Sequence, residues 1–256
     1  MLAAARAAGS AIRALASDAE AAERKPDGSL VSVADRAASA IIGPRLRSLD
    51  PRLPVICEEA MQDTAGAPRF WLVDPLDGTR EFLRGSDVFS VNIALIEDGY
   101  PCYGLIHLPA SGLSYWGASG AGAWRDGSAI HPRPLAAAGA GLHALVSPGE
   151  RDSARREFAA ALARHGGTPR IEAAAGAIKF CWLAEGHGDL YPRRTRTCAW
   201  DTAAGQAILE AAGGAVYDAR WQRLRYRQTP GWYNGDFVAV ADAGADWAAL
   251  LGAGRG

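Results

Sequence analysis

Sulfur and histidine patterns typical of metal sites are missing from this sequence. The five histidines form no H-E-x-x-H pattern, and the four cysteines are widely scattered without a C-x-x-C pair: Cys57, Cys102, Cys181 and Cys198. This spacing favours reduced thiols and disfavours a zinc cluster. A histidine-based metal site is not expected either, and we predict surface or ordinary core positions for the histidines.

Long apolar runs and a strong net charge are also missing. No run approaches the roughly 20 apolar residues of a transmembrane helix. The formal net charge of −1 gives no electrostatic reason to bind nucleic acid or a membrane. The Ala-rich start is interrupted by Arg6, Arg13, Asp18 and Glu20, which predicts an amphipathic helix rather than a signal peptide. A cytoplasmic protein is therefore the expectation.

The pattern of the 256-residue chain changes near residues 132–140. Before this segment the sequence predicts one or two helices and an antiparallel meander, with Asp98-Gly99 as a hairpin turn. After it, helices alternate with strands, as in layered α/β proteins. We therefore expect an α/β (α+β layered) fold with an N-terminal half, residues 1–134, and a C-terminal half, residues 135–256.

Residues typical of turns and helix ends occur at four places: residues 25–29 (KPDGS), Ser32 with Asp35, Asp201 or Thr202, and Gly213-Gly214. The first of these predicts a turn. Ser32 with Asp35 three residues later resembles a capping box, although Asp replaces the usual Glu or Gln. The last two predict a helix that begins near Asp201 and ends at the glycine pair.

Acidic residues recur where apolar runs end or helices begin: Asp35, Glu58, Glu59, Asp74, Asp77 and Asp201. In a layered fold such positions face a common edge. Hard cations take oxygen ligands, so a site built from carboxylates without His or Cys predicts Mg²⁺, or Mn²⁺, rather than zinc.

The densest group of these acids lies in the stretch DPLDGT, residues 74–79. Pro75 favours a turn over continuation of the strand, so Asp74 and Asp77 can point to one centre together with the Leu76 carbonyl. Gly78 allows the backbone to approach a ligand closely. The helical turns expected next offer free N–H groups that suit a phosphate. Cations beside such a cradle are typical of metal-assisted phosphoester hydrolysis.

Two other readings of this stretch stay open. Asp-x-x-Asp-Gly is also a good surface turn. Haloacid-dehalogenase-type phosphatases carry D-x-D-G-T after a strand, and their first Asp forms a phospho-aspartyl intermediate. The extra residue between Asp74 and Asp77 disfavours that covalent mechanism, and direct attack by water is the preferred interpretation.

Three acidic motifs, in order along the chain, resemble the inositol monophosphatase superfamily: CEEA, WLVDPLDGTREF and WDTAAG. Among its members the bacterial 3′(2′),5′-bisphosphate nucleotidases are most similar, on the strength of KFCWLAEGHGDLYPR followed by WDTAAGQAI. The resemblance covers most of the chain and implies the alternating αβαβα sandwich of that superfamily. It also implies two or three Mg²⁺ ions, inhibition by lithium and a homodimer.

The resemblance assigns a role to most of the acidic residues. The metal-binding oxygens would come from Glu58, Asp74, Asp77, Asp201 and the Leu76 carbonyl. Asp35 and Thr79 match the pair that orients and deprotonates the attacking water, and the amides of Gly78 and Thr79 would hold the scissile phosphate. Glu59 has either a water-mediated role or a purely structural one.

Two basic residues match the positions that nucleotidases use near the non-reacting 5′-phosphate, namely Lys179 and Arg193. The alternatives are an exposed helix lysine for Lys179, and for Arg193 a generic basic rim shared with Arg194 and Arg196. Cations opposite an acidic metal site suit a doubly phosphorylated ligand.

The base-recognition half departs from the nucleotidase pattern. Glu150 stands where those enzymes have the histidine that helps to hold adenine, and Gly176 and Ala177 stand where they have serine hydroxyls. Thr195 replaces a glycine. Cys57 replaces a serine, and we interpret it as a small buried residue rather than a redox-sensitive thiol.

The preferred hypothesis is Mg²⁺-dependent hydrolysis of adenosine 3′(2′),5′-bisphosphate to AMP and phosphate. An inositol or sugar monophosphatase is the alternative, motivated by Glu150 in place of histidine. A non-catalytic protein that binds a phosphate ligand is a further alternative, which the retention of Asp35 and Thr79 disfavours. In each case the partner is a small phosphate ester, and fold or family alone does not identify it.

Overall fold

A computed structural model describes residues 1–16, 23–24, 30–60, 64, 66–135, 139–228 and 232–252. The turn expected at residues 25–29 lies outside these ranges. The helices are α1 (Leu2–Ala14), α2 (Val33–Leu49), α3 (Thr79–Leu83), α4 (Asp152–Ala163), α5 (Ile178–Ala184), α6 (Ala199–Ala212) and α7 (Trp247–Leu251). No helix in the described ranges is long and apolar enough to cross a bilayer.

The first large sheet has seven strands in sequence order: β3 (Val55–Cys57), β4 (Arg69–Asp77), β5 (Ser90–Glu97), β6 (Tyr100–His107), β7 (Ser114–Ala118), β8 (Gly122–Arg125) and β9 (Ser128–Ile130). Only β3 and β4 are parallel, and the other neighbours form the expected antiparallel meander. Asp98 and Gly99 join β5 to β6 with positive φ angles of 52° and 84°. The predicted hairpin turn is therefore confirmed.

The second large sheet has the strand order β11-β10-β12-β16-β14. Its strands are β10 (His143–Val146), β11 (Arg170–Ala173), β12 (Leu190–Arg193), β14 (Ala215–Asp218) and β16 (Phe237–Val240). It is mixed, because β10 runs parallel to β11 and β12 whereas β16 is antiparallel to β12 and β14. Two small ribbons pair β1 (Glu23–Arg24) with β2 (Leu30–Val31), and β13 (Thr197–Cys198) with β15 (Tyr233–Asn234).

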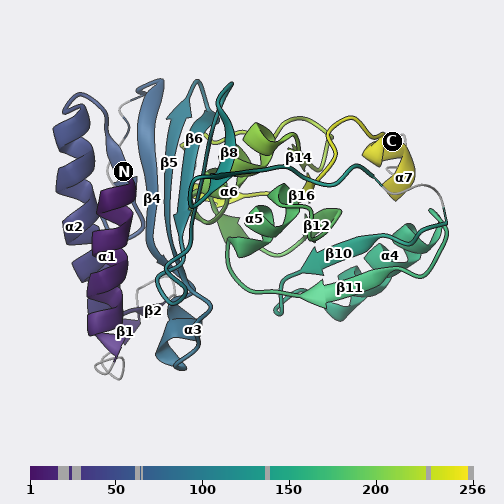
Figure 1. Ribbon diagram of the computed structural model, residues 1–256, viewed down its shortest axis with the longest axis horizontal. Helices are drawn as coiled ribbons and strands as arrows, with labels where there is room; N and C mark the ends of the chain where they lie inside the picture. Colours follow the sequence, from purple (N-terminus) through teal and green to yellow (C-terminus); the bar gives the residue numbers. More distant parts are fainter. Residues whose placement is uncertain are drawn as a thin grey trace.

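These elements stack in five layers, as Figure 1 shows. Helices α1 and α2 cover one face of the seven-stranded sheet, and α5 and α6 lie between that sheet and the second one. Helices α4 and α7 lie beyond the second sheet. The predicted alternating αβαβα sandwich is confirmed.

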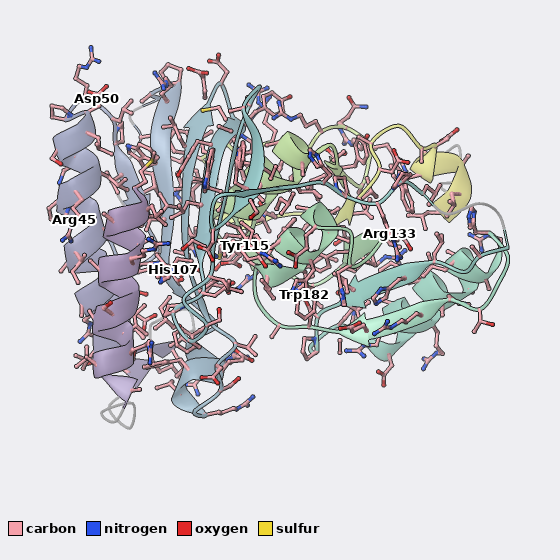
Figure 2. The ribbon with its side chains drawn as sticks, viewed as in Figure 1. Arg45, Asp50, His107, Tyr115, Arg133 and Trp182 are labelled. Carbon is pink, nitrogen blue, oxygen red and sulfur yellow. The ribbon has the colours of Figure 1, made fainter. Side chains whose placement is uncertain are left out.

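Three groups of buried apolar side chains fill the spaces between the layers. One joins α1 and α2 to the first sheet and includes Ile12 and Ile42. A second surrounds α5 and α6 and includes Phe180 and Ile208, and a third lies under α4 and α7 and includes Trp247. Figure 2 shows side chains filling these spaces throughout.

Two local expectations need correction. Strand β4 does not stop at Pro75 but runs to Asp77, because a register shift between Asp74 and Asp77 places one extra residue opposite β5. Pro75 falls in this bulge, where no ladder N–H is needed. Helix α6 begins at Ala199, ahead of the predicted start, and Asp201 is its third residue rather than its cap.

The two predicted halves correspond to the two large sheets, since β9 ends at Ile130 and β10 begins at His143. Helix α6 comes from the second half but packs on β5, β6 and β7 of the first. We keep the division at residues 134 and 135 as a proposal about chain organisation rather than about separate domains.

The close approach of α6 to the sheet depends on Gly104 of β6. A Cβ atom at this position would lie 2.2 Å from the Ala204 backbone oxygen, so even alanine forces the helix away. We expect Gly104→Ala to lower the free energy of unfolding by about 3 kcal/mol, as measured by urea denaturation. Gly235→Ala is the control, because Gly235 has open space around its Cβ position. Equal stability of the two variants would contradict the packing argument.

Candidate active site

A cavity of about 450 Å³ collects seven of the residues predicted from the acidic motifs: Glu58, Asp74, Leu76, Asp77, Gly78, Thr79 and Asp201. They come from the ends of β3 and β4, from the start of α3 and from the first turn of α6. Three segments far apart in the chain therefore meet at one edge of the seven-stranded sheet. The lining does not include Glu59, Lys179 or Arg193.

The bulge at the end of β4 orients two of the carboxylates. Asp74 Oδ1 accepts a hydrogen bond of 3.1 Å from the Leu76 N–H. Asp77 Oδ2 accepts one of 2.7 Å from the Ala177 N–H, which belongs to the C-terminal half. The Ser90 hydroxyl lies 3.4 Å from the same oxygen. Asp77 is therefore held from both halves of the chain.

The turn into α3 requires glycine at position 78. Gly78 has a φ of 92°, and a Cβ atom there would lie 2.8 Å from the Val88 backbone oxygen. This left-handed conformation strains residues with a side chain. The turn at Gly78 ends β4 and starts α3, and it places the Thr79 hydroxyl at the acidic cavity.

Asp35 lies directly behind Thr79 and is almost fully buried, with 1% of its surface exposed. Its Oδ1 accepts a hydrogen bond of 3.0 Å from Thr79 Oγ1. Its Oδ2 accepts bonds of 2.7 and 2.6 Å from the N–H and hydroxyl of Ser32. The predicted capping box at the start of α2 is confirmed, and it also fixes the carboxylate that faces Thr79.

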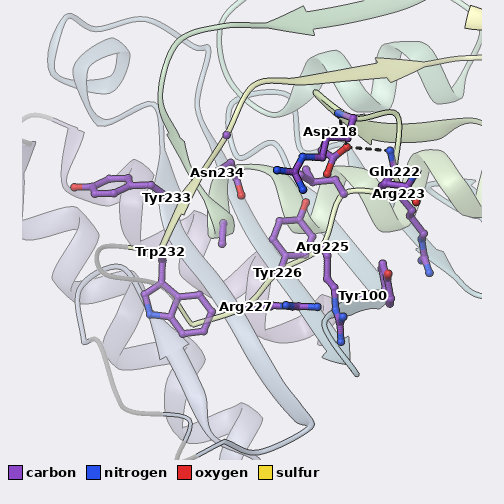
Figure 3. A pocket seen from close by; sticks show the side chains of 14 residues that line it. Tyr100, Asp218, Gln222, Arg223, Arg225, Tyr226, Arg227, Trp232, Tyr233 and Asn234 are labelled. Carbon is purple, nitrogen blue, oxygen red and sulfur yellow. Dashed lines mark hydrogen bonds between the residues drawn. The ribbon is translucent and has the colours of Figure 1, made fainter. Parts of the chain in front are cut away.

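Asp201 enters the cavity from the first turn of α6. Its Oδ2 accepts a hydrogen bond of 2.7 Å from the Cys198 N–H. The Asn234 amide nitrogen lies 2.8 Å from the Cys198 carbonyl and 2.9 Å from Thr202 Oγ1. Figure 3 shows Asn234 between Tyr233 and Tyr226, in a neighbouring pocket of about 490 Å³. Asn234 therefore braces the helix start that carries Asp201.

Burial and mutual repulsion make the carboxylates hard to ionise together. Burial raises the pKa of Asp74 well above its usual value, and the negative charges of Glu58 and Asp77 raise it further. Burial, followed by the charge of Asp77, raises the pKa of Asp201 to about 8. Crowded, buried oxygen donors of this kind fit hard divalent cations, which would relieve the repulsion.

Lys179 is buried, so the alternative of an exposed helix lysine is wrong. Its ammonium group donates to the carbonyls of Ala174 and Gly176 and lies 4.6 Å from the centre of the Tyr191 ring. Burial lowers the pKa of Lys179 to about 7, although the charge of Asp77 opposes the shift. Lys179 thus holds the loop whose Ala177 N–H binds Asp77.

Arg193 donates to the Thr195 carbonyl at 3.1 Å and lines a different cavity from the acidic one. Its charge nevertheless lowers the pKa of Asp201, which places it near the site electrostatically. The cations that do line the acidic cavity are Arg80 and Arg196. Arg196 lies 3.8 Å from the centre of the Tyr233 ring.

Glu59 and Cys57 lie beside the site without entering the cavity. The carboxylate of Glu59 contributes to a raised pKa of Arg36, so it lies near that surface arginine. Burial raises the pKa of the Cys57 thiol, and its sulfur lies 3.3 Å from the Ser39 hydroxyl. The interpretation of Cys57 as a small buried residue is confirmed.

Comparison with known proteins decides between the families that use such sites. The family model for the inositol monophosphatase family matches residues 1–248. The chain belongs to the inositol monophosphatase family. The 3′(2′),5′-bisphosphate nucleotidase CysQ of Salmonella typhimurium is 38% identical over 217 residues, covering 84% of this chain and 86% of the relative. Its Escherichia coli counterpart is 36% identical over 216 residues, with 83% and 86% covered.

Solved structures of the inositol monophosphatase family share the fold. CysQ from Bacteroides thetaiotaomicron superposes with a TM-score of 0.78 at 33% identity and covers 93% of this chain and 94% of its own. An IMPase from Thermotoga maritima gives a TM-score of 0.81 at 23% identity, with 98% and 94% covered. The second similarity concerns the fold alone.

Several residues of this family member support the site but were not predicted to do so: Ser90 below Asp77, Asn234 behind α6, and Arg80 and Arg196 in the cavity lining. One signal for Ser90 was available, because Ser90 and Asn92 are alternate polar residues in an otherwise apolar strand. No local signal marks Asn234, since its partners are more than 30 residues away.

The raised pKa of Asp201 predicts how pH acts on the metal-free protein. Between its ordinary pKa and the raised pKa of the folded state, this carboxyl ionises in the unfolded protein but stays protonated in the folded one. Stability should therefore fall as the pH rises from 3.8 towards about 8. The contribution of one such carboxyl is up to about 1.4 kcal/mol per pH unit. We expect the Tm of EDTA-treated protein to show this fall.

Asp201→Asn should make that fall less steep, because the amide does not ionise. Saturating Mg²⁺ should oppose it in the wild type, since binding favours the ionised carboxylates. A Tm of the EDTA-treated wild type with the same pH dependence as the variant would contradict the assignment.

Proposed function

We propose that the protein hydrolyses phosphomonoesters with Mg²⁺ by direct attack of water, and that adenosine 3′(2′),5′-bisphosphate is its substrate, giving AMP and phosphate. The observation that carries the reaction type is the Asp35–Thr79 hydrogen bond at the border of a buried carboxylate cavity. A binding protein needs the cavity but has no need for a buried proton acceptor behind a hydroxyl.

The metal ligands we propose are the oxygens that converge in the cavity: Glu58, Asp74, Asp77, Asp201 and the Leu76 carbonyl. Their chemistry suits two or three Mg²⁺ ions, with Mn²⁺ as a substitute. Bound Mg²⁺ supplies Lewis-acid polarisation of the phosphate and makes a nearby water more acidic. Glu59 is proposed to act on the site only through water.

The proton path runs through residues of this chain. The Thr79 hydroxyl donates to Asp35 Oδ1, so its lone pairs are free to accept a proton from the attacking water. As the water oxygen forms its bond to phosphorus, the water proton passes to Thr79 and the Thr79 proton passes to Asp35. The phosphorus–oxygen ester bond breaks on the opposite side, and the leaving oxygen takes a proton from solvent.

The substrate assignment rests on the relatives and on the cations around the cavity. CysQ proteins at 36–38% identity carry the name 3′(2′),5′-bisphosphate nucleotidase. We propose that the Gly78 and Thr79 amides hold the scissile phosphate and that Arg193 faces the second one. Lys179 contributes to binding of the second phosphate by fixing the loop at Ala174 and Gly176 and by its positive charge. A second phosphate would match the cations beside the acidic site, which include Arg80 and Arg196 in the cavity lining.

Thr79 provides a test of the proton path with a matched pair of variants. Thr79→Ala should lower kcat about a hundredfold, because the water loses its proton acceptor. Thr79→Ser keeps the hydroxyl and should retain most activity. The Mg²⁺ concentration at half-maximal activity should stay near that of the wild type in both variants. Equal losses in both variants would contradict the assigned role.

Glu150 is the specific observation that favours an inositol or sugar monophosphatase instead. Its buried carboxylate accepts from the Arg194 N–H at 3.2 Å and from the Thr195 hydroxyl at 3.5 Å, so it braces the chain at the position where the resemblance to nucleotidases implies a histidine. The decisive measurement compares kcat/KM for adenosine 3′,5′-bisphosphate and for inositol 1-phosphate at equal Mg²⁺.

We expect the bisphosphate to be preferred by at least about tenfold, equivalent to about 1.4 kcal/mol. A preference for inositol 1-phosphate would overturn the substrate and leave the reaction type intact. Binding of metal and ligand without turnover of any phosphomonoester would favour the non-catalytic alternative. Inhibition by lithium, a homodimer and a cytoplasmic location stay predictions.

A further inference from the structure

A second group of metal-ligating side chains lies in the C-terminal half, outside the lining of the acidic cavity. It consists of His143 at the start of β10, Glu172 on β11, and His187 just after α5. Their ligand atoms all lie within 4.8 Å of one another. In the β10–β11 register Glu172 lies opposite Leu145, two residues beyond His143, so both ligands project from the same face of the sheet.

The geometry of the three donors resembles that of a tetrahedral metal site. Glu172 Oε2 lies 3.0 Å from His143 Nε2 and 3.4 Å from His187 Nε2. Zinc–ligand bonds of about 2.0–2.1 Å in a tetrahedron place neighbouring donors about 3.3 Å apart. Small movements would bring all three atoms into contact with one ion.

His143 supplies an independent indication that this group can hold a ligand. Only 5% of its surface is exposed, and its buried Nε2 atom makes no hydrogen bond within the described part of the chain. The short distance to Glu172 lacks hydrogen-bond geometry. A buried imidazole nitrogen without a partner is costly, and this one points at a carboxylate and a second imidazole.

We propose that His143, Glu172 and His187 bind one divalent transition-metal ion of the zinc type, at a site separate from the carboxylate cavity. Two imidazoles and one carboxylate suit zinc rather than Mg²⁺, which prefers oxygen ligands. The side chain of His187 is 43% exposed, so solvent reaches the site and a water can fill the fourth position.

Arg170 competes for the same carboxylate. Its Nη2 lies 2.7 Å from Glu172 Oε2, and its side chain is 66% exposed. An exposed ion pair of this kind contributes little to stability, so the guanidinium can leave when a metal arrives. This contact yields an unusual expectation, namely that removal of Arg170 strengthens metal binding.

The test is titration of purified protein with Zn²⁺ by calorimetry in saturating Mg²⁺, and with Co²⁺ by visible absorption. We expect the wild type to bind one more Zn²⁺ than His187→Gln or Glu172→Gln, and to show a tetrahedral Co²⁺ spectrum that both variants lose. Arg170→Ala should bind Zn²⁺ more tightly than the wild type. His165→Gln, at a histidine outside the group, should leave both readouts unchanged.

These variants separate the new site from the acidic one. His187→Gln removes a partly exposed side chain, so its fold can be verified by Tm and by retained phosphatase activity. Equal Zn²⁺ stoichiometry and an unchanged Co²⁺ spectrum in the wild type, His187→Gln and Glu172→Gln would overturn the proposal. Weaker Zn²⁺ binding in Arg170→Ala would also contradict the assigned geometry.

Discussion

Repulsion between buried carboxylates is the constraint on which the rest of the site depends. Each of four acids receives a hydrogen bond from one backbone N–H, and the pairs are Asp35 with Ser32, Asp74 with Leu76, Asp77 with Ala177, and Asp201 with Cys198. Backbone donors fix a carboxylate without adding a positive side chain that would compete with a metal ion. The bulge in β4, the glycine turn and the Ser32–Asp35 capping box serve this arrangement.

The parts of the site that were predictable are those encoded within a few residues. The stretch at residues 74–79 and the Ser32–Asp35 box depend on local backbone geometry, so their spacing was informative. The alternation of helices and strands in the second half likewise predicted a layered α/β fold. The resemblance to a family then joined motifs that are more than 100 residues apart.

Other features depend on packing that no local pattern records. The burial of Lys179 beneath the loop that it holds depends on such packing. The predicted start of α6 lay too late in the chain because Asp201 does not cap the helix. Its carboxylate instead reaches back to accept a hydrogen bond from the Cys198 N–H. The histidine group escaped notice because its members come from three separate segments of the chain.

The hydrogen bond between Asp77 and Ala177 spans 100 positions of the sequence. One partner ends a strand of the first sheet, and the other begins the segment that leads into α5. Asp201 likewise enters the cavity from α6, which belongs to the C-terminal half. A fragment limited to residues 1–134 would lack both the Ala177 N–H and the Asp201 carboxylate, so neither half of the chain carries the complete site.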